Sequence, residues 1–135
     1  MANSYPLCAG FVVLNRSLTK TIIVTTHSGN HSFPKGKRES GETDHDAAIR
    51  ELREESGLTP TDIEQTNLVF DEASRKGNPS VRYFVCYAED SYKPVVVDEG
   101  ELTTSEWIGA EQVYKLPHLK DARKEVLRLA IQRLS

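Results

Sequence analysis

Short apolar runs alternate with polar, turn-forming segments along the first part of the chain. Leu7–Leu14 (LCAGFVVL) is an apolar run, which predicts a buried strand. Thr21–Thr26 (TIIVTT) is β-branched throughout and predicts a second strand. The polar segment Asn15–Lys20 between them predicts a turn. A loop is expected to follow, marked by Gly29, Asn30, Pro34 and Gly36.

Two later segments have the spacing of helices. The first helix is expected to begin after Thr43, an N-cap with Asp46 as its capping-box partner, and to run to about Ser56. Gly57 is the expected stop. A second helix is predicted over His118–Leu134. Its apolar residues keep helical spacing on one face, at Leu119, Ala122, Val126, Leu129, Ala130 and Leu134.

The remaining apolar segments predict further strands. Asn67–Glu72 and Val81–Glu89 are separated by the turn-forming RKGNPS, and Val95–Val97 and Glu106–Ile108 are shorter candidates. Strands and helices are mixed without a strand–helix–strand rhythm, so we expect an α+β fold with a mixed sheet between helices. The length of 135 residues suits a single domain over residues 1–135.

Composition adds expectations about location and partners. The net charge of −3 weakly disfavours a stable nucleic-acid partner. No apolar run approaches the ~18 residues of a membrane span, so no membrane contact is expected. Met1–Pro6 lacks the basic and apolar parts of a signal peptide. This favours a cytoplasmic protein and leaves open secretion after removal of a signal. Separately, we expect a monomer or a homodimer.

Three glutamates of the first predicted helix share one face. Glu51, Glu54 and Glu55 stand at positions i, i+3 and i+4, where their repulsion would weaken the helix unless a cation compensates it. Clustered carboxylate oxygens suit a hard divalent cation, Mg²⁺ or Mn²⁺. The loop before the helix supplies Lys35, Lys37 and Arg38 for phosphate oxygens. Taken alone, the pattern also fits a solvated charged helix face, as most charge runs do.

Residues 36–58 resemble the Nudix box, the signature of the Nudix hydrolase family, written GX5EX7REUXEEXGU with U aliphatic. Gly36 is followed after five residues by Glu42, and after seven more by the run RELREESGL, Arg50–Leu58. Every fixed position matches. The resemblance implies a Nudix fold, an α/β/α sandwich around a mixed sheet. It also implies hydrolysis of a nucleoside diphosphate, or another diphosphate, that is linked to a further group.

The resemblance implies roles for the matching residues. The expected metal ligands are Glu51, Glu54, Glu55 and the backbone carbonyl of Gly36. Arg50 is expected to orient the glutamates, and Glu42 to support this network or a further metal. The general base is expected to be Glu51, Glu54 or an acid of the later loop Asp98–Glu101, where Glu99 and Glu101 are candidates. A metal-activated water would attack phosphorus in line, without a covalent enzyme intermediate.

The box specifies a reaction rather than a substrate. The FPKGK loop resembles those of diadenosine polyphosphate hydrolases, diphosphoinositol polyphosphate phosphohydrolases and decapping enzymes. Two later segments resemble those of the diphosphoinositol polyphosphate phosphohydrolases. We therefore expect a small, phosphate-rich anionic substrate, foremost a diphosphoinositol polyphosphate, with diadenosine polyphosphates such as Ap5A or Ap6A also accepted. The candidate substrate-binding residues are Lys35, Lys37, Arg38, Arg75, Lys76, Arg82, His118 and Lys120. Several of them could equally be ordinary surface charges.

Other substrates stay open. An asymmetric diadenosine tetraphosphate (Ap4A) hydrolase would need an aromatic platform, for which Tyr83, Phe84 and Tyr87 are available although at least one should be core. Those hydrolases tend to carry a tyrosine where this chain has Arg75. Decapping enzymes normally add an RNA-binding helical domain, and oxidised-nucleotide sanitising enzymes have more apolar pockets. A non-catalytic binding module would usually have lost a box glutamate.

Overall fold

Strand β1 (Cys8–Leu14) occupies the centre of a mixed sheet in the computed structural model, which describes residues 6–100 and 102–135. It pairs in parallel with β6 (Pro79–Ala88) along its whole length. Outside β6 lies β5 (Ile63–Ala73), antiparallel to it. On the other side the order continues through β2 (Lys20–Thr26) to β3 (His31–Ser32). The α+β fold with a mixed sheet is thus confirmed.

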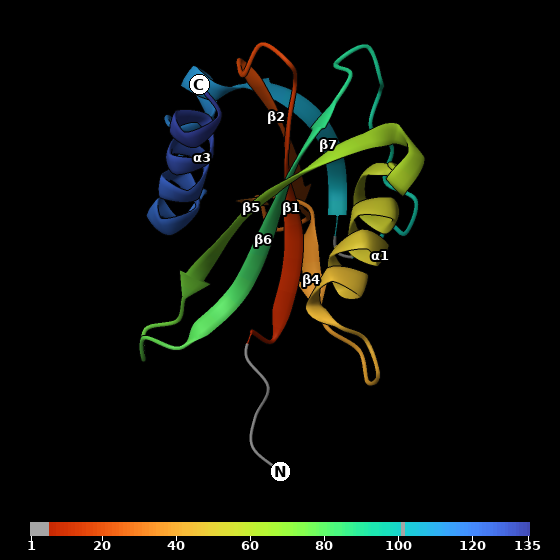
Figure 1. Cartoon of the computed structure of the whole chain (residues 1–135), viewed down its shortest axis with the longest axis vertical. Coiled ribbons are helices and arrows are strands. Elements are labelled where there is room, and N and C mark those ends of the chain that lie inside the picture. The colour runs from red at the N-terminus through yellow and green to blue at the C-terminus, as the bar shows by residue number, and fades with distance from the viewer. Residues whose placement is uncertain (1–5, 101) are drawn as a thin grey trace.

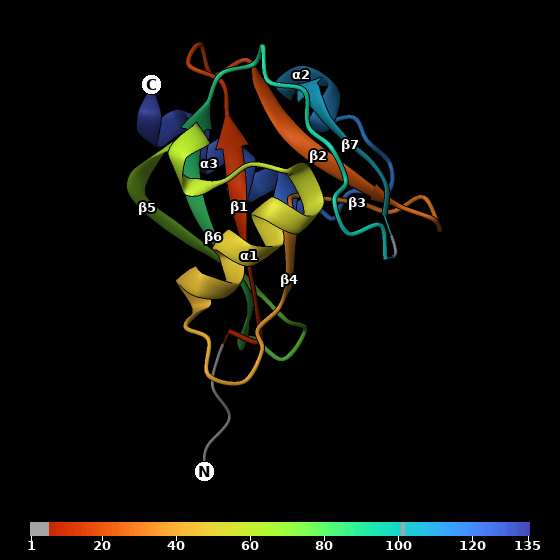
Figure 2. The ribbon, with the colours of Figure 1, turned by 90° about the vertical axis from the view of Figure 1, so that its right-hand side faces the viewer.

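The edge of β1 opposite β6 is shared by two strands that diverge. Its first residues pair with the short strand β4 (Lys35–Lys37), whereas β2 pairs with β1 only through Leu14 and Thr21. Strand β2 then pairs over its length with β7 (Leu102–Gly109). The sheet therefore opens between β4 and the end of β2, on the side that faces the viewer in Figure 2.

Helices cover both faces of the sheet, with α1 (Asp44–Ser56) on one side and α3 (Asp121–Leu134) on the other (Figure 1). Side chains of β1 alternate between these two layers. Phe11 and Val13 pack with α1, and Val12 and Leu14 pack in the core beneath α3. A short helix α2 (Ala110–Val113) and a 3₁₀ turn η1 (Pro60–Asp62) complete the elements.

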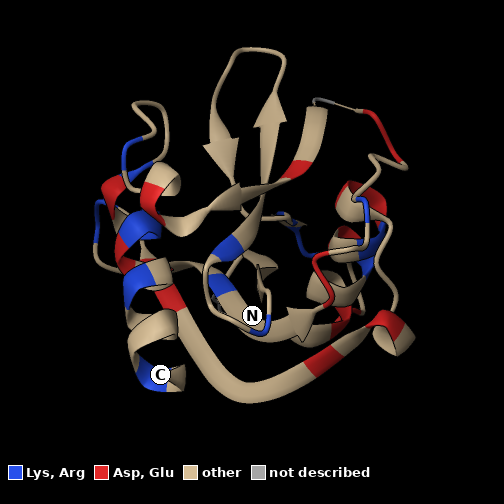
Figure 3. Cartoon of the chain, turned by 90° about the horizontal axis from the view of Figure 1, so that it is seen from above, with Lys and Arg blue, Asp and Glu red and all other residues tan. Residues whose placement is uncertain are grey.

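The two main helices carry opposite charge. Helix α1 has five acidic and two basic residues, whereas α3 has two acidic and four basic residues (Figure 3). None of the helices in the described part of the chain combines the length and apolarity needed to cross a membrane.

Helix α1 begins and ends where the sequence predicts. The Thr43 hydroxyl accepts from the Asp46 backbone N–H at 3.0 Å, and the Asp46 carboxylate accepts from the Thr43 N–H at 3.4 Å, a complete capping box. Gly57 ends the helix with φ of 82°, in the left-handed region that glycine adopts readily. The acidic face of α1 is therefore fixed at both ends.

One predicted strand is wrong and several elements differ in extent. Val95–Val97 is not a strand. The segment lies alongside the last turn of α1, where the Val95 and Val97 N–H groups donate to the carbonyls of Ser56 and Glu54 at 2.9 Å each. These carbonyls lack partners within the helix, so the segment satisfies them. The predicted helix over His118–Leu134 begins only at Asp121. Strands β5 and β7 are longer than predicted, and β3, β4 and α2 were not predicted.

A buried charged network ties α3 to the sheet. Glu72 on β5 accepts from Arg123 Nε at 2.9 Å and from the Tyr83 hydroxyl at 3.0 Å. The side chains of Arg123 and Glu72 are only 9% and 4% exposed. Burial raises the pKa of Tyr83, which therefore stays a donor. The charges of Arg123 and Glu72 can be buried among apolar side chains because the two are opposite and hydrogen-bonded to each other.

Candidate functional site

Strand β4 lies so close to α1 on one side and to β1 on the other that a side chain at either of two glycines would overlap a neighbour. A Cβ atom at Gly36 would overlap the carboxylate of Glu51, and one at Gly10 would overlap the Pro34 carbonyl of the neighbouring chain segment. The Pro34 carbonyl also accepts from the Phe11 N–H at 3.0 Å, which fixes the approach. The backbone at Gly36 therefore lies directly against the Glu51 side chain.

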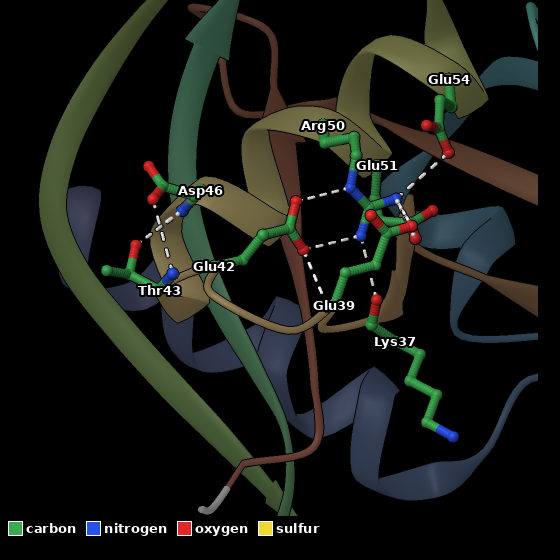
Figure 4. Close-up of polar contacts among 8 residues, drawn as sticks. All are labelled: Lys37, Glu39, Glu42, Thr43, Asp46, Arg50, Glu51 and Glu54. Carbon is green, nitrogen blue, oxygen red and sulfur yellow. Dashed lines mark hydrogen bonds and ion pairs between the residues drawn. The ribbon is translucent and has the colours of Figure 1, made fainter.

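Arg50 organises the carboxylates of the site (Figure 4). Its guanidinium contacts both Glu42 oxygens, at 2.7 and 3.0 Å, and donates to Glu51 at 3.0 Å and Glu54 at 3.3 Å. It also donates to the Lys37 carbonyl at 3.0 Å. The hydrogen bonds from Arg50 lower the pKa of Glu42 to about 2. Arg50 thus links the loop, β4 and α1 through one side chain.

The buried glutamates have raised pKa values. Burial raises the pKa of Glu55 to about 8, against a hydrogen bond from the Lys35 N–H at 3.0 Å and with the added repulsion of Glu51. Burial likewise raises the pKa of Glu51, although the Arg50 charge opposes the change. A nearby cation would favour the charged form of both carboxyls and reverse these shifts.

These side chains line a cavity of about 400 Å³ in the opening between β4 and β2. Its wall includes four acids and two lysines, namely Glu51, Glu54, Glu55, Asp98, Lys35 and Lys37. Val24, Thr26 and Ser32 contribute from β2 and β3. The cavity therefore combines an acidic floor from α1 with basic side chains from β4.

The oxygen atoms available in the cavity as metal ligands fit a hard divalent cation. Carboxylate oxygens are the ligands that Mg²⁺ and Mn²⁺ prefer, and the Gly36 backbone lies directly against the Glu51 carboxylate in this cavity. Within residues 6–100 and 102–135, no three acidic, histidine or cysteine side chains already converge into a complete ligand set. Glu51 and Glu54 instead turn to Arg50, and Glu55 accepts from the Lys35 backbone.

Asp98 reaches the cavity because its segment lies alongside the end of α1. Its N–H and that of Val97 both donate to the Glu54 carbonyl, at 3.0 and 2.9 Å, and Asp98 lines the cavity whereas Glu99 does not. The Tyr92 hydroxyl donates to the Ser56 carbonyl at 3.0 Å and strengthens the attachment. The candidate Glu101 lies outside the described residues. The acidic DEGE sequence signalled this loop, but only the attachment to α1 singles out Asp98.

The predicted substrate-binding cations are only partly brought together. Lys35 and Lys37 line the cavity, and Arg38 follows them at the end of β4. Arg75 and Lys76 are exposed in the β5–β6 turn, which Figure 1 shows well apart from α1. These last two residues therefore do not contribute to the cavity in this structure.

Arg82, His118 and Lys120 also lie outside the cavity. Arg82 is paired with Asp44 at 2.7 Å and with Asp71 at 2.9 Å, so its charge joins the start of α1 to the sheet. His118 and Lys120 are exposed ahead of α3, where the His118 carbonyl accepts from the His31 N–H at 3.1 Å. Because Ser32 next to His31 lines the cavity, His118 lies near its rim.

The chain is similar in sequence to mRNA-decapping enzymes. The chain is 28% identical over 129 residues to mRNA-decapping enzyme subunit 2 of Saccharomyces cerevisiae (strain YJM789), which covers 93% of this chain and 13% of that protein. It is 26% identical over 120 residues to mRNA-decapping enzyme subunit 2 of Arabidopsis thaliana, covering 87% of this chain and 30% of that protein. The chain thus spans less than a third of the length of these relatives.

Solved structures share the fold, and a family model matches the sequence. The binary complex of C. elegans Ap4A hydrolase superposes with a TM-score of 0.77 at 19% identity, covering 94% of this chain and 96% of that one. The NUDIX domain of Shewanella oneidensis NrtR complexed with ADP ribose superposes with a TM-score of 0.72 at 19% identity, covering 99% and 91%. The NUDIX domain model matches residues 4–130, which include the complete box. The chain therefore belongs to the Nudix hydrolase family.

Proposed function

We propose that the protein hydrolyses phosphoanhydride bonds of nucleoside polyphosphates with the help of a divalent metal, foremost in substrates whose phosphates bridge two nucleosides. The observation that carries the proposal is the Arg50 guanidinium, which holds Glu51 and Glu54 at 3.0 and 3.3 Å in a cavity that two lysines also line. An ordinary solvated helix face would leave its carboxylates dispersed. Here a single arginine orients them towards a shared space.

Each part of the cavity has a role in this proposal. Glu51, Glu54, Glu55 and the Gly36 carbonyl would hold Mg²⁺ or Mn²⁺, whose charge would offset that of the phosphates and make a water more acidic for in-line attack on phosphorus. Lys35 and Lys37 bind phosphate oxygens as flexible cations. Glu51 or Glu54 accepts the proton of the attacking water, and Asp98, whose N–H is bonded to the Glu54 carbonyl, supplies a further acid. Arg50 positions the carboxylates without touching substrate.

The balance of charge favours a substrate with few phosphates. The cavity wall in the described part of the chain has two lysines against four acids. A diphosphoinositol polyphosphate carries phosphates around its whole ring and needs cations on several sides, whereas a linear phosphate bridge needs them on one. The names of two similar proteins, m7GpppN-mRNA hydrolase and Ap4A hydrolase, also describe substrates with such a bridge.

A diphosphoinositol polyphosphate is the second candidate. It is favoured by three cations near the same end of the sheet, Arg38, Arg75 and Lys76, for which no ion pair exists within residues 6–100 and 102–135. A large ligand that extended from the cavity across the starts of β1 and β6 would meet them.

A parallel assay separates these candidates. With Mg²⁺ present, we expect hydrolysis of Ap4A or of a capped RNA, monitored by separating the nucleotide products, to exceed in kcat/KM the hydrolysis of a diphosphoinositol polyphosphate or of oxidised dGTP. Faster cleavage of the inositol substrate would replace the first candidate by the second. If the whole panel bound without being cleaved, the protein would be a binding module and the proposed hydrolysis would be wrong.

Replacing Gly36 with alanine is expected to lower kcat by about 100-fold, because the new methyl group displaces the Glu51 carboxylate and a shift near 1 Å can have an effect of that size. Gly109→Ala is the matched control, since the nearest atoms to its Cβ are 3.8 Å away. Steady-state kinetics and a thermal melt should show lost turnover in G36A alone, with both variants folded. Unchanged turnover in G36A would show that the contact with Glu51 has no part in catalysis.

A further inference from the structure

A second cavity of about 390 Å³ adjoins the acidic one. It is lined by the turn between β2 and β3, through Thr26, His27, Ser28 and Asn30, and by Gly100. Thr26 and Gly100 line both cavities, so the two spaces lie next to each other. Figure 2 shows the β2–β3 turn projecting beside the segment that leads into β7. A substrate held over α1 would therefore extend towards this turn.

The turn is shaped by its own hydrogen bonds. The Thr26 N–H donates to the Asn30 carbonyl and the Gly29 N–H to the Thr26 carbonyl, both at 2.9 Å. The Asn30 N–H also donates to the Thr26 hydroxyl at 3.1 Å. Gly29 has φ of 88°, which suits glycine. The wall of the second cavity is therefore formed before any ligand binds, as in most small-molecule sites.

The chemistry of this wall differs from that of the acidic cavity. Its described residues include no lysine, arginine, aspartate or glutamate, and they offer an imidazole, an amide and two hydroxyls. His27 and Asn30 are exposed, and no hydrogen bond engages the imidazole of His27 or the side-chain amide oxygen of Asn30 within residues 6–100 and 102–135. A neutral group with hydrogen-bonding edges fits this wall, and a phosphorylated ring does not.

We infer that the second cavity binds the nucleoside next to the cleaved phosphoanhydride bond. His27 stacks on or hydrogen-bonds to the base, because histidine is among the aromatic side chains on which bases stack. Asn30 contributes amide hydrogen bonds to the base or ribose. The volume of about 390 Å³ lies within the usual range of roughly 300–1,000 Å³ for ligand pockets. This inference rests on the proposed hydrolysis and names the residues that select its substrate.

Binding can be tested without turnover. The full chain, labelled with ¹⁵N, is titrated with AMP, with inorganic phosphate and with inositol hexakisphosphate. We expect AMP to shift the amide signals of residues 26–30, and phosphate alone to leave them in place. AMP shifts confined to other parts of the chain would overturn the inference, as would equal shifts from inositol hexakisphosphate.

Kinetics of matched variants provide the second test. For Ap4A we expect His27→Ala and Asn30→Ala each to raise KM by about three- to tenfold with kcat nearly unchanged, the loss of about one hydrogen bond or stacking contact. Asn67→Ala, an exposed asparagine on β5, should leave KM unchanged. Unchanged KM in both cavity variants would overturn the inference. If the wild-type chain cleaves no substrate yet AMP still shifts residues 26–30, the hydrolysis fails and the nucleoside site stands.

Discussion

Replacing Glu54 with glutamine is expected to lower kcat by about 10³-fold. The amide keeps the size of the side chain and can still accept from Arg50, which lies 3.3 Å from the carboxylate, but it removes the negative charge that a divalent cation needs. The loss of metal assistance amounts to several kcal/mol of transition-state stabilisation, and about 1.4 kcal/mol corresponds to tenfold in rate. Steady-state hydrolysis of Ap4A across a range of Mg²⁺ concentrations measures the change.

The control for this substitution is Glu111→Gln, which alters an exposed glutamate on α2. Both variants should unfold at nearly the temperature of the wild type. If E54Q retained more than about a tenth of the wild-type kcat at saturating Mg²⁺, a lost interaction worth less than about 1.4 kcal/mol would rule out Glu54 as a metal ligand.

Replacing Arg123 with alanine is expected to lower the free energy of unfolding by about 3–5 kcal/mol, because Glu72 is then buried without its partner. Tyr83 still donates to Glu72 but cannot balance its charge. For a domain of this size the melting temperature should fall by roughly 10 °C or more. Urea unfolding at neutral pH measures the free energy directly.

An exposed pair on the same helix supplies the comparison. Arg128 contacts Glu125 with both side chains more than half exposed, so Arg128→Ala should lower the free energy of unfolding far less than Arg123→Ala. Replacing the whole buried network with Arg123→Met, Glu72→Leu and Tyr83→Phe should restore most of the stability. Equal destabilisation by R123A and R128A would show that the buried network does not stabilise the fold.

The sequence predicted best those elements whose signals are local. Helix α1 has its cap at Thr43, its stop at Gly57 and its acidic face within a single segment, and each lies where expected. Val95–Val97 was misjudged because three β-branched or apolar residues in a row resemble a strand. Val95 and Val97 are in fact 57% and 53% exposed, and their backbone pairs with the end of a helix that precedes them by some forty residues.

The candidate site, like the fold, was predictable where its residues belong to one continuous segment. The Nudix box places Arg50 and the three glutamates together, since they lie on one helix. Asp98 joins them through the backbone bonds of its segment to the end of α1, and the polar turn at Thr26–Asn30 through the divergence of β2 from β1. No short-range pattern encodes either arrangement. Arg82 reads as a free cation along the sequence, and only folding brings it to Asp44 and Asp71.

The alternation of β1 side chains between two apolar layers limits how this strand can change. A single residue inserted within Cys8–Leu14 would exchange the sets that face α1 and α3, so both layers would lose their fit at once. The same shift would move Ala9 from its position opposite Gly36, and with it the backbone that rests on Glu51. Changes of length are therefore better tolerated in the turns, and an altered length of the β2–β3 turn would reshape the polar cavity while leaving the carboxylates of α1 in place.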